Sequence, residues 1–230
     1  MNKYLVLCCL VIVSACTDKK TALFNEIKSL EQSEKINTDE GLMDLAALQA
    51  KYGLKYKDSL GNLYLYSAGQ FYFHQNEFEQ SKELLYEYIH RDDTSKLFKD
   101  AALNLATIES NQNNHITASE LVNEVLSDQL PSKMQWVAIE EVYKAKDSLT
   151  IADYENLVKA HIATGKFNDA LKAIDKATTQ NQDSEKRGDL LYRGGFIGWE
   201  YLEDAEIAEK YYSKFLSEYP NDEKAGEVKA

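Results

Sequence analysis

Apolar residues recur along this chain at intervals of three and four, the period of an amphipathic α-helix. Leu23, Ile27 and Leu30 are one such set. Alternating β-branched runs, which would indicate strands, are absent. The pattern therefore predicts an all-α chain. About eleven helices are expected, over residues 20–34, 39–52, 61–75, 78–91, 95–111, 114–128, 132–146, 150–164, 167–180, 185–201 and 204–218.

Residues that begin helices agree with this division. Ser132 follows a proline and precedes Gln135 by three positions, and Thr150 precedes Asp153 by the same interval. Both pairs match a capping box, in which each side chain bonds the backbone N–H of the other residue. The links between expected helices are short, so neighbouring helices should run antiparallel.

A set of small and aromatic residues also recurs along the chain, at intervals much longer than the helical period. Gly69, Tyr72, Phe78 and Ser81 place small and aromatic residues at the end of one expected helix and the start of the next. The same frame returns at three later places: Leu105, Ala106 and Ala118; Leu157, Gly165, Phe167 and Ala170; and Trp199, Ala208, Tyr212 and Pro220. The small residues Ser81, Ala118, Ala170 and Ala208 are 37, 52 and 38 positions apart. A fixed frame of this kind indicates stacked helix pairs.

These frames resemble the tetratricopeptide repeat (TPR) family. The resemblance covers residues 61–221 and implies an α-α superhelix, a right-handed solenoid of antiparallel helix pairs. An extra helix near 132–146 would fill the longest gap and leaves the pairing of helices over 132–164 open. Residues 20–58 would form a divergent first pair, and 222–230 a tail. A generic helical bundle is the alternative.

The N-terminus has the features of an export signal. Lys3 is followed by an uncharged apolar run over 4–13 and then by Val13-Ser14-Ala15-Cys16. This ending resembles a bacterial lipobox, which implies cleavage before Cys16 and attachment of acyl chains to its thiol. Residues 1–15 would then be the signal peptide and 16–19 a tether. The alternative is an ordinary signal peptide with a chance cysteine.

Composition narrows the classes of function. Cys8 and Cys9 lie in the segment expected to be removed, so Cys16 would be the remaining thiol and no disulfide could form. Stability must come from apolar packing, which 44% hydrophobic residues can supply. The net charge of −12 repels phosphate backbones, and no cluster of Lys and Arg offsets it. Nucleic-acid binding is therefore not expected.

The sequence contains no recognisable catalytic or metal-binding constellation. No two of the four histidines are four residues apart, and no phosphate loop or GxSxG motif occurs. Gly194, Gly195 and Gly198 fall inside an expected helix, where close helix packing explains them better than phosphate binding. Glu140 and Glu141 are interpreted as solvated. We expect no catalytic residues, no metal and no cofactor, and therefore no enzyme.

In the TPR family the first helix of each pair lines a concave surface that binds peptides, and the resemblance places a groove here. Its expected lining residues are Tyr66, Gln70, Phe73, His74, Asp100, Thr107, Asn111, Glu155, Lys159, Arg193, Ile197, Glu200 and Tyr201. Tyr66 and Phe73 would be the aromatic anchors. The alternative is that these two pack against the helix over 39–52.

Two short segments, Asp58-Ser59-Leu60 and Asp147-Ser148-Leu149, resemble the Bacteroidetes sequon for O-glycosylation. Both fall in expected loops. The alternative is that Asp and Ser cap the helix that follows.

Together these features predict a lipid-anchored scaffold that binds an envelope protein or peptide. The repeat at the C-terminus is similar to those of exported lipoproteins of Bacteroidetes-type bacteria and of the outer-membrane assembly lipoprotein. This similarity implies an anchor in the outer membrane, a periplasmic scaffold, and roles in outer-membrane assembly, secretion or envelope maintenance. A ligand- or glycan-binding uptake lipoprotein, a bundle-type hydrolase and a purely structural spacer remain as alternatives.

Overall fold

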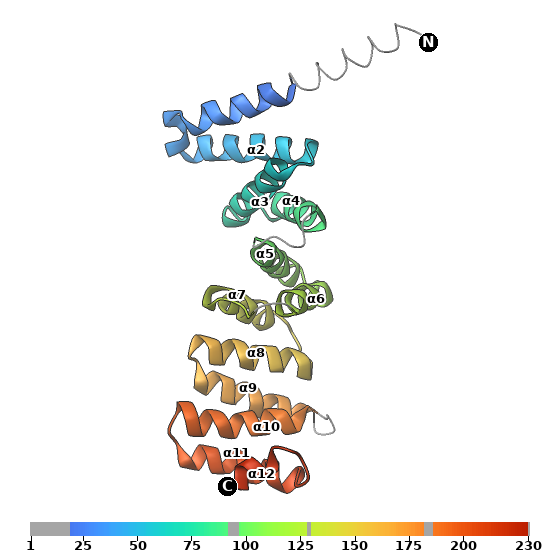
Figure 1. The fold of residues 1–230 in the computed structure, drawn as a ribbon, viewed down its shortest axis with the longest axis vertical. Coiled ribbons are helices and arrows are strands. Elements are labelled where there is room, and N and C mark those ends of the chain that lie inside the picture. The colour runs from blue at the N-terminus through green and yellow to red at the C-terminus, as the bar shows by residue number, and fades with distance from the viewer. Residues whose placement is uncertain (1–18, 92–96, 128–129, 182–185, 230) are drawn as a thin grey trace, which may run out of the picture. The chain divides into compact units, whose positions relative to one another are not determined.

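A computed structural model describes residues 19–91, 97–127, 130–181 and 186–229. Every regular element in these ranges is a helix, and helices that follow one another pack together (Figure 1). The all-α fold of consecutive helix pairs is therefore confirmed. The chain divides into two compact units, residues 1–108 and 109–230, which are described separately.

The described part of the first unit begins with a helix over residues 19–31, which packs on the helices that follow it. Leu23 and Ile27 of this helix form a core cluster with Tyr52 and Tyr64. The helix was expected to continue to residue 34, but Ser33 donates its hydroxyl to the Leu30 carbonyl and a short 3-10 turn follows. The further elements are η1 (Glu34–Asn37), α2 (Asp39–Lys55), α3 (Ser59–His74), α4 (Phe78–Arg91) and α5 (Phe98–Asn111), the last of which continues into the second unit.

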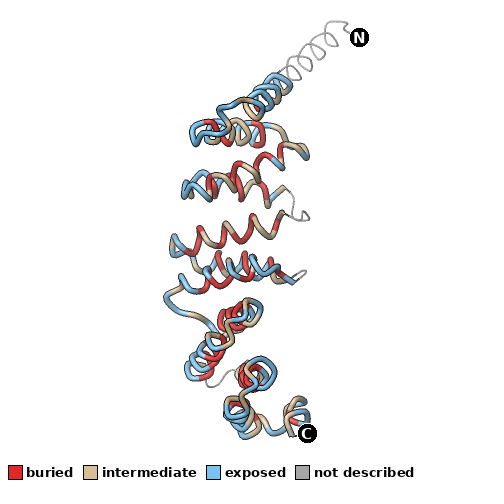
Figure 2. The backbone as a smooth tube through the Cα atoms, turned by 90° about the vertical axis from the view of Figure 1, so that its left-hand side faces the viewer, coloured by how far each residue is buried: buried red, intermediate tan, exposed pale blue. Residues whose placement is uncertain are grey.

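The second unit continues with helices of similar length. They are α6 (His115–Leu126), α7 (Lys133–Lys144), α8 (Ile151–Thr164), α9 (Phe167–Gln180), α10 (Arg187–Phe196), the π-helix η2 (Ile197–Tyr201), α11 (Ala205–Glu218) and α12 (Ala225–Lys229). The sequence pattern missed η1 and α12, because each is too short to show a helical period. In each unit the buried residues lie on the sides of helices that face a neighbouring helix (Figure 2).

The turns inside four helix pairs share one backbone conformation in the described part of the chain. Among the described residues, positive φ angles outside glycine occur at Asn76 (61°), Asn113 (63°) and Glu203 (52°), and Gly165 has φ 78°. Each of these residues lies five positions before one of the small residues Ser81, Ala118, Ala170 and Ala208. The frame seen in the sequence therefore corresponds to a repeated left-handed turn, in which a helix ends and the next one begins.

Hydrogen bonds across these turns repeat as well. The N–H of Glu77 donates to the carbonyl five residues back, at 2.9 Å, and Asn114 and Lys166 do the same at 2.8 Å. In the last pair, Asp204 N–H donates to Gly198, six residues back, at 2.9 Å. The π-helix η2 accounts for the difference, because its wider turn accommodates one more residue before the same left-handed position.

Small residues let the paired helices approach closely. The hydroxyl of buried Ser81 donates to the Gly69 carbonyl at 2.9 Å, which joins α3 to α4. A Cβ added at Gly69 would lie 2.6 Å from Leu85, a distance that packed carbon atoms do not adopt. Ala118, Ala170 and Ala208 are buried at the equivalent positions. The requirement for small residues that the repeat frame implied is confirmed.

The helix expected in the 52-residue gap is α7, and its packing shows how it is accommodated. It packs against α8, which packs in turn against α9. The Ser110 hydroxyl donates to the Val142 carbonyl of α7 at 2.9 Å, and the buried Tyr143 hydroxyl accepts a hydrogen bond from Asn156 of α8. Helix α7 is thus an inserted partner of α8, while α8 and α9 keep the repeated turn.

The predicted helix starts are confirmed at several places. Ser132 with Gln135 and Thr150 with Asp153 both form capping boxes. Asp58 accepts a hydrogen bond from Gly61 N–H and caps α3, so the capping interpretation holds for Asp58-Ser59-Leu60. Ser148 lies exposed in the loop before α8, whose cap is Thr150.

No helix in the described part of the chain has both the length and the apolar content needed to span a bilayer. The expected signal peptide and Cys16 lie outside the described residues. The lipid anchor therefore stays a prediction from sequence.

The turn at Gly165 allows a direct test of the repeated conformation. A Cβ at Gly165 would meet no atom within 4 Å, so Gly165→Ala changes only the backbone preference. We expect it to lower the free energy of unfolding by about 1–2 kcal/mol, because an L-residue is strained at positive φ.

The matched change is Glu203→Gly, which relieves the same strain at the last turn. It should raise the unfolding free energy by roughly 0.5–1 kcal/mol. Urea unfolding monitored by circular dichroism measures both variants. Equal stability of Gly165→Ala and the wild type would contradict the proposed role of this turn.

Candidate functional site

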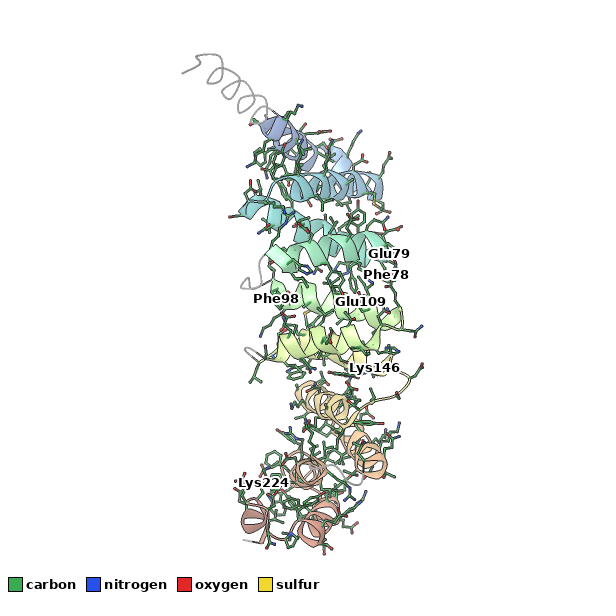
Figure 3. The ribbon with its side chains drawn as sticks, turned by 90° about the vertical axis from the view of Figure 1, so that its right-hand side faces the viewer. Phe78, Glu79, Phe98, Glu109, Lys146 and Lys224 are labelled. Carbon is green, nitrogen blue, oxygen red and sulfur yellow. The ribbon has the colours of Figure 1, made fainter. Side chains whose placement is uncertain are left out.

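The two aromatic residues expected to anchor a partner in the first unit are half-buried. The Tyr66 ring lies 5.4 Å from the Tyr88 ring, and burial together with the charge of Asp100 raises the pKa of Tyr66 to about 12. Phe73 lies 6.1 Å from Phe78 at the start of α4 (Figure 3). Both aromatic partners belong to α4, so Tyr66 and Phe73 mainly join α3 to α4 rather than offering open anchors.

Polar members of the expected groove lie close together on α3 and α5. Asn104 of α5 donates to the Gln70 side-chain oxygen of α3 at 2.8 Å. Asp100 lies near enough to Tyr66 to influence its pKa. Thr107 donates its hydroxyl within its own helix, and His74 is exposed at the end of α3. In the first unit, Tyr66 and Gln70 of α3 therefore lie near residues of α5, and their part in a groove stays a prediction.

The expected groove residues of α5 and α8 in the second unit are surface residues. Asn111 and Lys159 are exposed, and Lys159 donates to Asn156 of its own helix at 3.4 Å. Glu155 forms an ion pair with Lys186. These contacts hold polar side chains in place, but they form no concave aromatic site.

The last four predicted residues lie at the end of α10 and in the π-helix η2 that continues it. Arg193 is half-buried, and Glu200 and Tyr201 are exposed. Ile197 is fully buried, so its assignment to the groove surface is wrong. The reason is its position one turn after buried Gly194, on the packed side of α10.

Exposed aromatic side chains gather around Tyr201. The Tyr201 ring stacks on Phe167 of α9, with centroids 4.5 Å apart and planes 9° apart, and Phe196 meets it edge-on at 5.8 Å. Tyr201 is 44% exposed and Phe196 is 38% exposed. We name Phe167, Phe196 and Tyr201 the aromatic platform. Rings held by one another present apolar area at a low cost in entropy, as binding anchors do.

Glycines of α10 and η2 explain why the platform projects outward. A Cβ at Gly194 would lie 2.6 Å from the Tyr211 ring, and one at Gly198 would lie 2.7 Å from the backbone nitrogen of Ala208. The glycine side of α10 therefore packs directly on α11, which confirms the close-packing interpretation of this cluster. The bulky residues of the same segment are left to face away from that contact.

A second group of side chains gathers where α7 meets α8 and α9, and sequence reasoning missed it. Glu140 is 1% exposed and accepts hydrogen bonds from Lys166 at 2.8 Å, while Lys144 also pairs with it. The Nδ1 atom of buried His161 lies 3.7 Å from the same carboxylate. The interpretation of Glu140 as solvated is wrong, because packing of α7 on α8 covers it. Glu141 is 58% exposed, as expected.

The electrostatics of this cluster favour a structural role. Burial opposes ionisation of Glu140, but hydrogen bonds from Lys144 and Lys166 outweigh it and hold the pKa of Glu140 below its ordinary value. Burial also lowers the pKa of His161, so its imidazole is neutral at pH 7. A buried carboxylate with one ammonium partner on its own helix and one at the start of α9 joins α7 to α9 and offers no free base to a substrate.

A hollow of about 570 Å3 borders this cluster, and two of the lysines that line it are paired with carboxylates. His161 forms part of its lining. Lys146 (Figure 3) pairs with Asp153 at 2.8 Å, and Lys172 pairs with Asp169 at 2.9 Å. A hydrolase needs convergent titratable groups that are free to act. In the described ranges, no three His, Cys, Asp or Glu residues converge as a metal ion would require.

Comparisons with known proteins include a structural likeness. No family model matches the chain, and no curated protein matches it. A solved structure titled as the functional characterisation of Pseudomonas aeruginosa pilF is similar at 18% sequence identity, with a TM-score of 0.30. The match covers 73% of this chain and 96% of that chain. The function of this protein is therefore inferred from its own residues.

The buried carboxylate predicts a pH-dependent contribution to stability. A carboxylate whose pKa is lower in the folded state stabilises the fold above its unfolded pKa, and this gain is lost as the pH falls through the folded value. Stability of the wild type should therefore fall as the pH drops below 4.5, the ordinary value for Glu140.

Glu140→Gln should reduce that slope and lower the unfolding free energy at pH 7 by about 1–2 kcal/mol, a modest figure because both lysines reach solvent. Glu141→Gln is the matched control and should change neither quantity. Urea unfolding between pH 3 and pH 7 measures both, and identical pH profiles for the two variants would refute the assignment.

Proposed function

We propose that this protein is a lipid-anchored helical-repeat scaffold of a bacterial cell envelope, and that it binds another protein or a peptide through the aromatic platform. The platform carries this proposal. Tyr201 and Phe196 expose apolar ring surface, and stacking on Phe167 fixes their orientation before a partner arrives. Preorganised aromatic side chains are the residues that most often dominate binding energy at protein interfaces.

Charged residues beside the platform suit a peptide ligand. Glu200 is exposed next to Tyr201, and Arg193 lies half-buried one turn before Ile197. An apolar centre with charges of both signs around it resembles the core and rim of a protein interface. The platform stands on two packed helix pairs, α8 with α9 and α10 with α11, so its geometry is set by the fold rather than by a mobile loop.

The envelope location is supported by the sequence before the described residues. Cys16 is three residues before Lys19, where the first described helix begins. Three residues span at most about 10 Å, so acylation of Cys16 would hold that helix close to the membrane surface. We place the anchor in the outer membrane with the helices in the periplasm. The proposed roles are outer-membrane assembly, secretion or envelope maintenance.

A ligand- or glycan-binding uptake lipoprotein is the second candidate, and the same platform favours it. Exposed aromatic rings also provide flat apolar surface to the faces of sugar rings. A peptide should make contacts beyond the platform, along Glu200 and Arg193, whereas a small glycan should depend on the rings alone. Loss of binding in Arg193→Ala would therefore favour the peptide.

The test of the platform is capture of partners from cross-linked envelopes. The double variant Phe196→Ala, Tyr201→Ala should recover at least about tenfold less of the partner than the wild type, since two anchors are removed. Ile116→Ala, Leu130→Ala is the matched control. It also removes two exposed apolar side chains of the second unit, and it should recover the wild-type amount.

The outcome also distinguishes the platform from the groove residues of the first unit. Tyr66→Ala, Phe73→Ala should lower the free energy of unfolding, because it removes ring contacts between α3 and α4. The fraction of this variant that stays folded should recover nearly as much partner as the wild type. Equal recovery of every partner by the platform variant and the wild type would overturn the proposal.

A separate prediction concerns the anchor. Cys16→Ser should abolish labelling by a radioactive fatty acid and release the protein from membranes, because the acylated thiol is lost. Cys8→Ser, Cys9→Ser is the matched control and should keep both properties, since these residues lie in the segment expected to be removed. Labelling that persists in Cys16→Ser would show that the lipobox assignment is wrong.

A further inference from the structure

The outer side of α11 is covered less than the corresponding side of α9. Helix α9 lies between α8 and α10, and Arg187 at the start of α10 donates to the Thr178 carbonyl at 2.9 Å. Three residues of α9 are buried on this side, and their counterparts 38 positions later in α11 reach solvent. The positions are Leu171, Ile174 and Thr178 in α9 and Glu209, Tyr212 and Leu216 in α11. Tyr212 contacts Tyr192 of α10, with ring centroids 5.8 Å apart, and the five-residue helix α12 follows α11 in the described part of the chain.

A hollow of about 680 Å3 lies in this place, between α10, α11 and α12. Tyr192, Trp199, Tyr212, Leu216 and Val228 give it a mainly apolar wall. Trp199 is 62% exposed, although an indole ring is among the side chains that gain most from burial. We name this site the terminal hollow. It shares no lining residue with the aromatic platform.

The charges around the terminal hollow are acidic. Among the described side chains that line it, the charged ones are Glu209 and Glu227. Burial raises the pKa of Tyr212, and the negative charge of Glu227 raises it further. Lys224 lies near the Tyr192 ring, but it is engaged in an ion pair with Asp189 (Figure 3). An anionic lipid surface would be repelled here, and a cationic partner would be attracted.

We propose that the terminal hollow binds an amphipathic helix with a basic polar face, supplied by another protein. The apolar wall would receive the hydrophobic side of this helix, in the place that α10 takes against α9. Glu209 and Glu227 would face its lysines or arginines. A second copy of this acidic chain, with its net charge of −12, is a poor electrostatic match for the same rim.

The test uses the fluorescence of Trp199 in purified full-length protein. The probe is a synthetic helical peptide with leucine at positions i, i+3, i+4 and i+7 and with lysine on its other face. Binding should shift Trp199 emission to shorter wavelength, because the indole ring leaves water, and the shift should saturate. The shift should disappear in Trp199→Phe if the signal comes from the hollow rather than from buried Trp136.

Variants separate the apolar and electrostatic parts of the site. Calorimetry should show that Trp199→Ala weakens binding of the lysine peptide at least about tenfold. Glu209→Gln, Glu227→Gln keeps the side-chain shapes and should weaken binding about tenfold at low salt and less at high salt. The platform variant Phe196→Ala, Tyr201→Ala is the matched control and should bind the peptide as the wild type does.

Several results would overturn this proposal and leave the proposed role of the aromatic platform unaffected. One is equal affinity for the lysine peptide and for the same sequence with glutamate in place of lysine. Another is equal affinity for a scrambled peptide of identical composition, which would show attraction by charge alone. A third is a dimer of the protein, seen by sedimentation, that dissociates in Trp199→Ala, because a second copy would then fill the hollow.

Discussion

The repeated left-handed turn is the constraint on which the helix pairs depend. It lies five residues before a small buried residue in every pair that has it, and the small residue lets the two helices approach. Together these positions fix where the first helix ends, where the second begins and how closely they pack. The side chains that remain free to vary are those on the outer sides, where the aromatic platform and the terminal hollow lie.

Most of the fold could be predicted from the sequence, because local signals determine helix ends. The apolar period and the capping boxes at Ser132 and Thr150 placed α7 and α8 to within two residues. The candidate site was less predictable, because it depends on tertiary contacts. The sequence around Glu140 predicts an exposed side chain, but α8 covers it in the structure. The repeat frame predicts Ile197 in the groove, but the glycine side of this segment packs on α11 and buries Ile197.

The aromatic platform and the terminal hollow both include residues of one segment, 194–201, at the end of α10 and in η2. Gly194, Gly195 and Gly198 give α11 direct access to the backbone of α10 and η2. Phe196 and Tyr201 then project to the platform, while Trp199 lines the hollow. Exposed aromatic residues are costly for a molecule that has no use for them, and three of them within six residues are best explained by binding.

The π-helix η2 shows how the side chains of such a surface can be turned to a new direction without repacking the interior. A helix pinned at both ends, here by buried Leu190 and by the turn at Glu203, can take in one additional residue only by widening locally. The side chains beyond that point are rotated around the axis while the anchors stay in place. Insertion of a single amino acid therefore offers a repeat protein a means of changing which partner it recognises while the core is left unaltered.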